Sequence, residues 1–84
     1  MEKNKPIRIL FAEDLPADAE MARREILKGG IEFTYRVVET ESEFRKELDE
    51  FQPDIVVSDY SMPTFDGMEA LKITRSFCRH IPFI

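Results

Sequence analysis

The sequence has a single cysteine, Cys78, so a disulfide cannot form within the chain. No apolar stretch approaches the roughly 20 residues that a membrane-spanning helix needs, and the charged start at residues 1–5 is unlike a signal peptide. These absences argue against a disulfide scaffold and against a membrane span in this segment. They favour a reducing, cytoplasmic compartment.

The chain also lacks a cluster of lysine and arginine residues that could neutralise a run of nucleic-acid phosphates. Its 12 basic and 17 acidic side chains give a formal net charge of -5, which argues against direct nucleic-acid binding. The sequence has no internal repeat, linker or low-complexity tract. With 84 residues, of which 43% are hydrophobic and 35% charged, the chain is expected to form one globular domain with a thin core.

Four short apolar segments have the composition of β-strands. Residues 7–12 follow Pro6 and are expected to form a buried strand, whereas residues 33–38 alternate apolar and polar side chains as a strand at the edge of a sheet does. Residues 55–57 are β-branched and apolar throughout, which predicts a central strand buried on both faces. Residues 81–84 are expected to begin a fourth strand.

Three helices are predicted between these strands. The first begins near Pro16 and ends at Gly29-Gly30, and the second opens with a capping box in which Thr40 is followed by Glu43. Pro53 prevents the second helix from continuing, and the third begins after Asp66-Gly67. The apolar positions that recur at helical spacing are Ala19, Ala22 and Ile26 in the first helix, Phe44, Leu48 and Phe51 in the second, and Met68, Leu71, Ile73 and Phe77 in the third.

Strands and helices alternate along the whole chain, which predicts an α/β fold with a doubly wound parallel sheet. Ligands bind to such sheets just beyond the carboxyl ends of the strands. Glu13 and Asp14 close the first strand, and Asp59 closes the third. If these two strands are neighbours, three carboxylates converge at one crevice.

Three neighbouring carboxylates raise one another's pKa values unless protons or a cation compensate their charge. Oxygen ligands of this kind suit Mg²⁺, and a carboxylate beside such a cation can attack a phosphoryl group to form an aspartyl phosphate. Asp59 is the best candidate for the nucleophile because it ends the most buried strand. Asp14 is favoured over Glu13 as the direct metal ligand.

Each of these acids also has a plainer interpretation. Asp59 taken alone would be a solvated aspartate at the end of a strand. Glu13 and Asp14 can complement the dipole at the N-terminus of the first helix, an effect that is compatible with metal binding.

The motifs around these acids resemble the receiver domain of two-component response regulators. The resemblance runs from about Ile7 to the last residue and includes the acidic pair that follows Ile9-Leu10-Phe11-Ala12. Its most specific part is the pattern Asp-x-x-Met-Pro-x-x-Asp-Gly, which extends from Asp59 to Gly67.

The resemblance implies a flavodoxin-like fold with strand order 2-1-3-4, in which Met62-Pro63 and Asp66-Gly67 shape the pocket. The phosphoryl donor would be a phosphohistidine on a histidine kinase or a phosphotransfer protein, and the chain would act as a conformational switch, not as an enzyme. The implied phosphoacceptor is Asp59, and the implied Mg²⁺ ligands are Glu13, Asp14, Asp59 and the backbone carbonyl of Ser61.

The family places a Ser or Thr at the end of the fourth strand and a Lys at the end of the fifth, and residues 1–84 include neither position. The chain is therefore expected to be the N-terminal portion of a receiver domain, without the fifth strand and the last two helices. A partly bare apolar sheet face and an unpaired edge at residues 81–84 are then expected, and the chain would self-associate through them. A longer parent chain would carry an output or kinase domain after this segment.

Two other functions remain open on sequence grounds. A magnesium-dependent phosphohydrolase with an aspartate nucleophile resembles this pattern, but such enzymes have a second Asp two positions after the nucleophile, where this chain has Ser61. A receiver-like interaction module that is never phosphorylated is the other alternative. Its signature would be loss of the acidic pair or of the acceptor, and all three acids are present.

Overall fold

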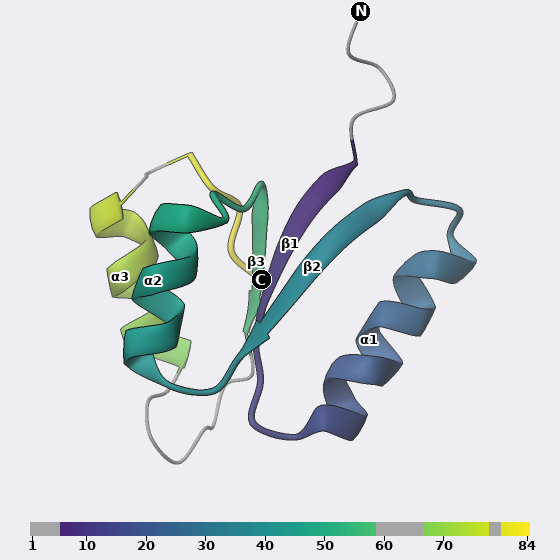
Figure 1. The fold of residues 1–84 in the computed structure, drawn as a ribbon, viewed down its shortest axis with the longest axis horizontal. Helices are drawn as coiled ribbons and strands as arrows, with labels where there is room; N and C mark the ends of the chain where they lie inside the picture. Colours follow the sequence, from purple (N-terminus) through teal and green to yellow (C-terminus); the bar gives the residue numbers. More distant parts are fainter. Residues whose placement is uncertain (1–5, 59–66, 78–79) are drawn as a thin grey trace, which may run out of the picture.

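The structure is a computed structural model that describes residues 6–58, 67–77 and 80–84. Strands and helices alternate along the chain, as the sequence predicts (Figure 1). The elements are, in order, β1 (Ile7–Ala12), α1 (Pro16–Lys28), β2 (Phe33–Val38), α2 (Glu41–Glu50), β3 (Ile55–Ser58) and α3 (Gly67–Phe77).

The three strands form one parallel sheet in the order β2-β1-β3. Helices α2 and α3 lie side by side on one face of this sheet, and α1 lies on the opposite face (Figure 1). The order and the two helical layers confirm the predicted doubly wound α/β fold. They also confirm that the alternating segment at residues 33–38 is a strand at the sheet edge.

The fourth apolar segment, residues 81–84, runs beside β3. It forms a single parallel bridge, from Phe83 to Val56, and not the beginning of a regular strand that the sequence predicts. The Val56 amide donates to the Pro82 carbonyl at 2.9 Å, and the Ile84 amide donates to the Val56 carbonyl at the same distance. The segment therefore occupies the position that the order 2-1-3-4 assigns to the fourth strand.

The ends of the first two helices follow from local sequence. Gly30, whose φ of 79° is a left-handed conformation that suits glycine, follows the end of α1. Thr40 caps α2, because its Oγ1 accepts a hydrogen bond from the Glu43 amide at 3.2 Å. The Glu43 carboxylate reaches back to the amide of Glu39 at 3.1 Å, one residue before the capping residue, so the predicted capping box is present in a shifted form.

The main core lies between the sheet and the helix pair α2 and α3. The sheet contributes side chains from all three strands, and Phe44 and Leu48 enter from α2 as predicted. Phe44 is completely buried, and Phe51 is half-buried beneath the Arg36 guanidinium, which lies 4.7 Å from the centre of its ring. The buried members of this core are Leu10, Ala12, Val38, Phe44, Leu48, Val56, Ala70 and Ile73.

The buried face of α3 differs from the sequence prediction. Met68 and Phe77 are 52% and 45% exposed, whereas Ala70, Ile73 and Thr74 are buried. Thr74 tolerates burial because its Oγ1 donates to the Ala70 carbonyl at 2.8 Å, which satisfies its only side-chain polar atom. Of the predicted apolar positions, Ile73 is thus buried, whereas Met68 and Phe77 lie on the exposed side of α3.

The opposite face of the sheet is buried over β1 but partly open on both sides of that strand. Ile9, Phe11 and Ala19 are buried on this side, whereas Ile55 and Val57 are only half-buried. The expectation that β3 is buried on both faces is therefore wrong within the described residues, because an open groove lies between Ile26 of α1 and the side chains of Ile55 and Val57.

A groove of about 430 Å³ occupies the open side of this face. Apart from Asp54, its lining is apolar and comes from strands, from α1 and from the fourth segment. This is the partly bare sheet face that the sequence predicts. The groove is lined by Ile7, Ile9, Ile26, Ile31, Asp54, Ile55, Val57, Pro82 and Ile84.

No helix within the described residues combines the length and the apolar character that crossing a bilayer requires.

Candidate functional site at the carboxyl ends of β1 and β3

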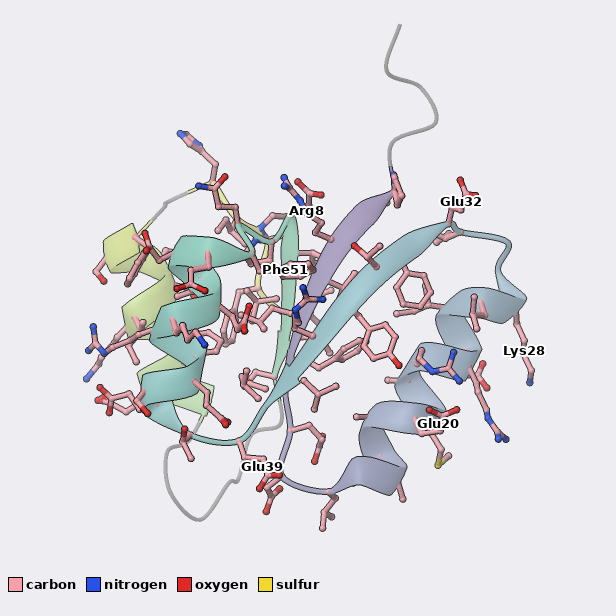
Figure 2. The ribbon with its side chains drawn as sticks, viewed as in Figure 1. Arg8, Glu20, Lys28, Glu32, Glu39 and Phe51 are labelled. Carbon is pink, nitrogen blue, oxygen red and sulfur yellow. The ribbon has the colours of Figure 1, made fainter. Side chains whose placement is uncertain are left out.

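The carboxyl ends of the three parallel strands meet at one edge of the sheet. Ala12, the last residue of β1, is paired in register with Val38 of β2 and with Ser58 of β3. The chain therefore leaves all three strands at the same level. Glu13 and Asp14 follow Ala12 directly, and Glu39 follows β2 at the same edge (Figure 2).

Glu13 is held at this edge by its backbone and by its side chain. Its amide donates to the Val38 carbonyl at 3.0 Å, which extends the pairing of β1 and β2 beyond the last strand residue. Its carboxylate accepts a hydrogen bond from the Leu15 amide at 3.3 Å, just before α1 begins. This bond places the Glu13 carboxylate beside the N-terminus of α1, a position that is compatible both with the plainer interpretation of Glu13 and with a metal role.

A second groove, of about 160 Å³, lies between α1 and β2 and has Glu13 in its lining. Its other polar residues are Glu20, Arg23, Tyr35 and Glu39, so the groove is rich in carboxylates. Asp14 is half-buried and is not among the residues that line this groove. The two adjacent acids therefore have different surroundings, as successive side chains at the end of a strand do.

Arg23 is the main positive charge in this groove. It donates two hydrogen bonds to the Glu20 carboxylate, one of them from Nε at 3.0 Å, and its guanidinium lies 5.8 Å from the centre of the Tyr35 ring. The hydrogen bond from Arg23 lowers the pKa of Glu20, with smaller contributions from Arg24, and the same bond raises the pKa of Arg23. Sequence reasoning missed this cluster, although the spacing of Glu20, Arg23 and Arg24 along a helix signals it.

The remaining predicted site residues fall in the part of the chain that the structure does not describe. Asp59, Ser61, Met62-Pro63 and Asp66 lie between the described residues Ser58 and Gly67. Their roles stay predictions. Ser58 itself is half-buried, and its amide donates to the Ile84 carbonyl at 2.9 Å, so the last residue of β3 is fixed on both sides by strand pairing.

The carboxylates of Glu13 and Asp14 are chemically suited to bind a hard cation. Glu13 and Asp14 offer carboxylate oxygens at a partly exposed edge, which are the ligands that Mg²⁺ prefers. Among residues 6–58, 67–77 and 80–84, no group of three or more His, Cys, Asp or Glu side chains is arranged to hold a metal ion. Two of the four predicted ligands, Glu13 and Asp14, belong to the described part of the chain.

No family model matches the chain, but a curated protein and a solved structure are similar to it. The chain is 34% identical over 82 residues to the response regulator MprA of Mycolicibacterium vanbaalenii. That alignment covers 94% of the chain but 33% of MprA, so the chain spans about a third of the length of this relative.

A solved structure shares the fold. The signal receiver domain of the response regulator NarL from Mycobacterium tuberculosis matches with a TM-score of 0.69 and 23% sequence identity. The match covers 93% of this chain and 61% of the NarL chain. Along almost its whole length the chain is thus homologous to part of one response regulator, and it has the fold of another's receiver domain.

Proposed function

We propose that the chain is a phosphoacceptor module in two-component signalling, in which Asp59 accepts a phosphoryl group from a phosphohistidine. The donor would be a histidine kinase or a phosphotransfer protein, and transfer would take place in the cytoplasm. The observation that carries the proposal is the register of β1 and β3, in which Ala12 is the partner of Ser58. Glu13 and Asp14 follow Ala12 in the sequence, and Asp59 follows Ser58.

The proposed transfer is a substitution at phosphorus. One oxygen of the Asp59 carboxylate forms a bond to phosphorus while the bond between phosphorus and the imidazole nitrogen of the donor breaks, which gives an acyl phosphate and a neutral histidine once a proton has been taken up. Ser58, the residue before Asp59, is fixed by strand pairing on both sides, which supports the proposal because a positioned nucleophile lowers the entropy cost of the attack.

Mg²⁺ would be held by Glu13, Asp14, Asp59 and the backbone carbonyl of Ser61, and when bound it would offset the negative charge of the carboxylates and the phosphoryl oxygens. Among the described residues, the chain's own contribution is to place Glu13 and Asp14 directly after β1, at the carboxyl ends of the strands. The strand bond from Glu13 to Val38 and the side-chain bond from Glu13 to the Leu15 amide restrict one member of the acidic pair.

The proposal is tested by incubating the 84-residue chain with Mg²⁺ and phosphoramidate, a small donor whose bond between phosphorus and nitrogen resembles that of phosphohistidine. We expect intact-mass spectrometry to show one phosphoryl group per chain, sensitive to hydroxylamine and absent when EDTA is added. Asp59→Asn should abolish the label, whereas Asp49→Asn, which removes an exposed acid of α2, should be labelled like the parent.

Two results would contradict the proposal. Labelling that survives Asp59→Asn would show that another residue is the acceptor. Continuous release of phosphate over many turnovers, without a labelled chain, would indicate a phosphohydrolase.

A further inference from the structure

Asp54 lies directly before β3, at the end of the sheet opposite the acidic pair, and it makes an unusual contact with β1. Its Oδ2 accepts a hydrogen bond from the Arg8 backbone amide at 2.9 Å, and its own amide donates to the Arg8 carbonyl at 2.7 Å. The Arg8 guanidinium also lies 3.5 Å from Asp54 Oδ1. One aspartate thus holds both polar groups of a β1 residue 46 positions away in sequence.

The register shows which strand bond the Asp54 carboxylate replaces. In this sheet an amide of β1 donates to the carbonyl of the residue before its partner: Ile7 is paired with Phe33 and donates to the Glu32 carbonyl at 3.2 Å. Ile9 is paired with Ile55, so one step back Arg8 faces Asp54. The acceptor in a continued ladder would be the carbonyl of Pro53, and the Asp54 carboxylate takes its position.

The backbone before β3 explains why a side chain acts as the acceptor. Gln52 has a φ of 53°, a left-handed conformation, and Pro53 follows it, so the chain turns sharply into the strand. A regular strand does not extend back to pair with Arg8. The Asp54 carboxylate satisfies the Arg8 amide that this turn would otherwise leave without a strand partner.

The apolar sequences of β1 and β3 specify their register only weakly, so the contact between Asp54 and Arg8 is needed to fix it. Residues 55–57 are all apolar, so a shift along β1 would still bring apolar side chains to both faces. Only four residue pairs join the two strands. Arg8 is the single charged residue of β1, and Asp54 is the charged residue directly before β3, so their contact distinguishes the observed register from its neighbours.

We propose that Asp54 is a positioning residue, whose carboxylate completes the ladder between β1 and β3 and thereby fixes the level at which Glu13-Asp14 and Ser58 leave the sheet. The register claim rests on the described geometry. Its consequence for phosphorylation rests on the proposed function, because it concerns how Asp59 meets the acidic pair.

The contact itself can be measured in the isotopically labelled 84-residue chain without any substitution. We expect a scalar coupling across the hydrogen bond from the Arg8 amide nitrogen to the side-chain carboxyl carbon of Asp54. A coupling to the carbonyl carbon of Pro53 in its place would overturn the proposal, because the ladder would then continue through the backbone.

Three variants separate the strand bond from the ion pair. Asp54→Ala should accelerate hydrogen exchange of the Arg8 amide about tenfold, the size expected for loss of one strand hydrogen bond. Asp54→Asn should exchange within about twofold of the parent, since its amide oxygen still accepts and an exposed ion pair contributes little. Arg8→Ala keeps the backbone amide and should retain its protection, and Asp49→Asn serves as the control for removing a nearby exposed charge.

The register is read from contacts across the strands. In the parent, Leu10 should give nuclear Overhauser effects to Val56, and Asp54→Ala should add contacts from Leu10 to residues two positions away, which mere loss of stability would not create. Equal acceleration in Asp54→Ala and Asp54→Asn, or an unshifted register in Asp54→Ala, would overturn the proposal.

Phosphoramidate labelling then connects the register to the site. We expect Asp54→Ala to slow labelling of Asp59 severalfold and Asp54→Asn to preserve it, and equal rates in all variants would refute the positioning role. If the parent itself is not labelled, the proposed function fails, while the coupling and exchange measurements still decide the role of Asp54 in the sheet.

Discussion

Phe44 offers the sharpest test of the core that supports the sheet. Its side chain is completely buried between α2 and the strands, where it is one of the two largest fully buried side chains. Truncation to alanine removes its apolar contacts and leaves a cavity, which costs about 3–5 kcal/mol for a buried phenylalanine. A chain of 84 residues has a total stability of roughly 4–13 kcal/mol, so Phe44→Ala should remove a large fraction of it.

Urea unfolding followed by circular dichroism measures this loss as a shift of the midpoint at constant slope. Phe77→Ala is the matched control, because Phe77 is 45% exposed at the end of α3 and its truncation should cost less than about 1 kcal/mol. Phe44→Leu should cost about 1.5 kcal/mol and remains measurable if the alanine variant does not fold. Equal losses for Phe44→Ala and Phe77→Ala would refute the placement of the core beneath α2.

Three further predictions concern a helix cap, an ion pair and the open sheet face. Thr40→Ala should lower the unfolding free energy by about 1 kcal/mol and Thr40→Ser should restore it, as urea unfolding will show; no loss would contradict the cap. The pKa of Glu20 is lower in the folded state, so its ionised carboxylate stabilises the fold above the unfolded-state pKa, and this stabilisation is lost as the pH falls through the folded-state pKa. The unfolding free energy of Glu20→Gln, measured with urea, should therefore fall less between pH 7 and about pH 4 than that of the parent. The apolar groove should cause self-association that Ile84→Lys weakens, and a parent chain that stays monomeric at high concentration in light scattering would contradict it.

The strands and the helix limits could be predicted from the sequence because they depend on local signals. The segments at residues 7–12 and 33–38 are strands over the predicted spans, and Thr40 caps α2 as the capping box indicates. The buried face of α3 was not predictable from hydrophobicity alone. Thr74 is less apolar than Met68, yet it is buried because a bond to its own helix satisfies its hydroxyl group.

Features that depend on contacts between distant segments were also beyond the sequence. The burial of Ile55 and Val57 depends on where α1 lies, which the apolar composition of β3 does not reveal. The link between Asp54 and Arg8 joins residues far apart in the chain and becomes visible only once the register is known. The acidic pair was found because parallel strands bring their carboxyl ends to one edge, which is a rule of topology and not of local sequence.

The proposed function requires that the acids following β1 and β3 share one divalent cation. Mn²⁺, which binds the same oxygen ligands as Mg²⁺ and broadens nearby nuclear resonances, tests it directly in the labelled chain. We predict that substoichiometric Mn²⁺ broadens the amide signals of Glu13, Asp14 and Asp59 together, that excess Mg²⁺ reverses the effect, and that Asp14→Asn weakens it at all three positions. Broadening confined to the end of one strand, or centred on the acidic first turn of α2, would refute a shared cation site.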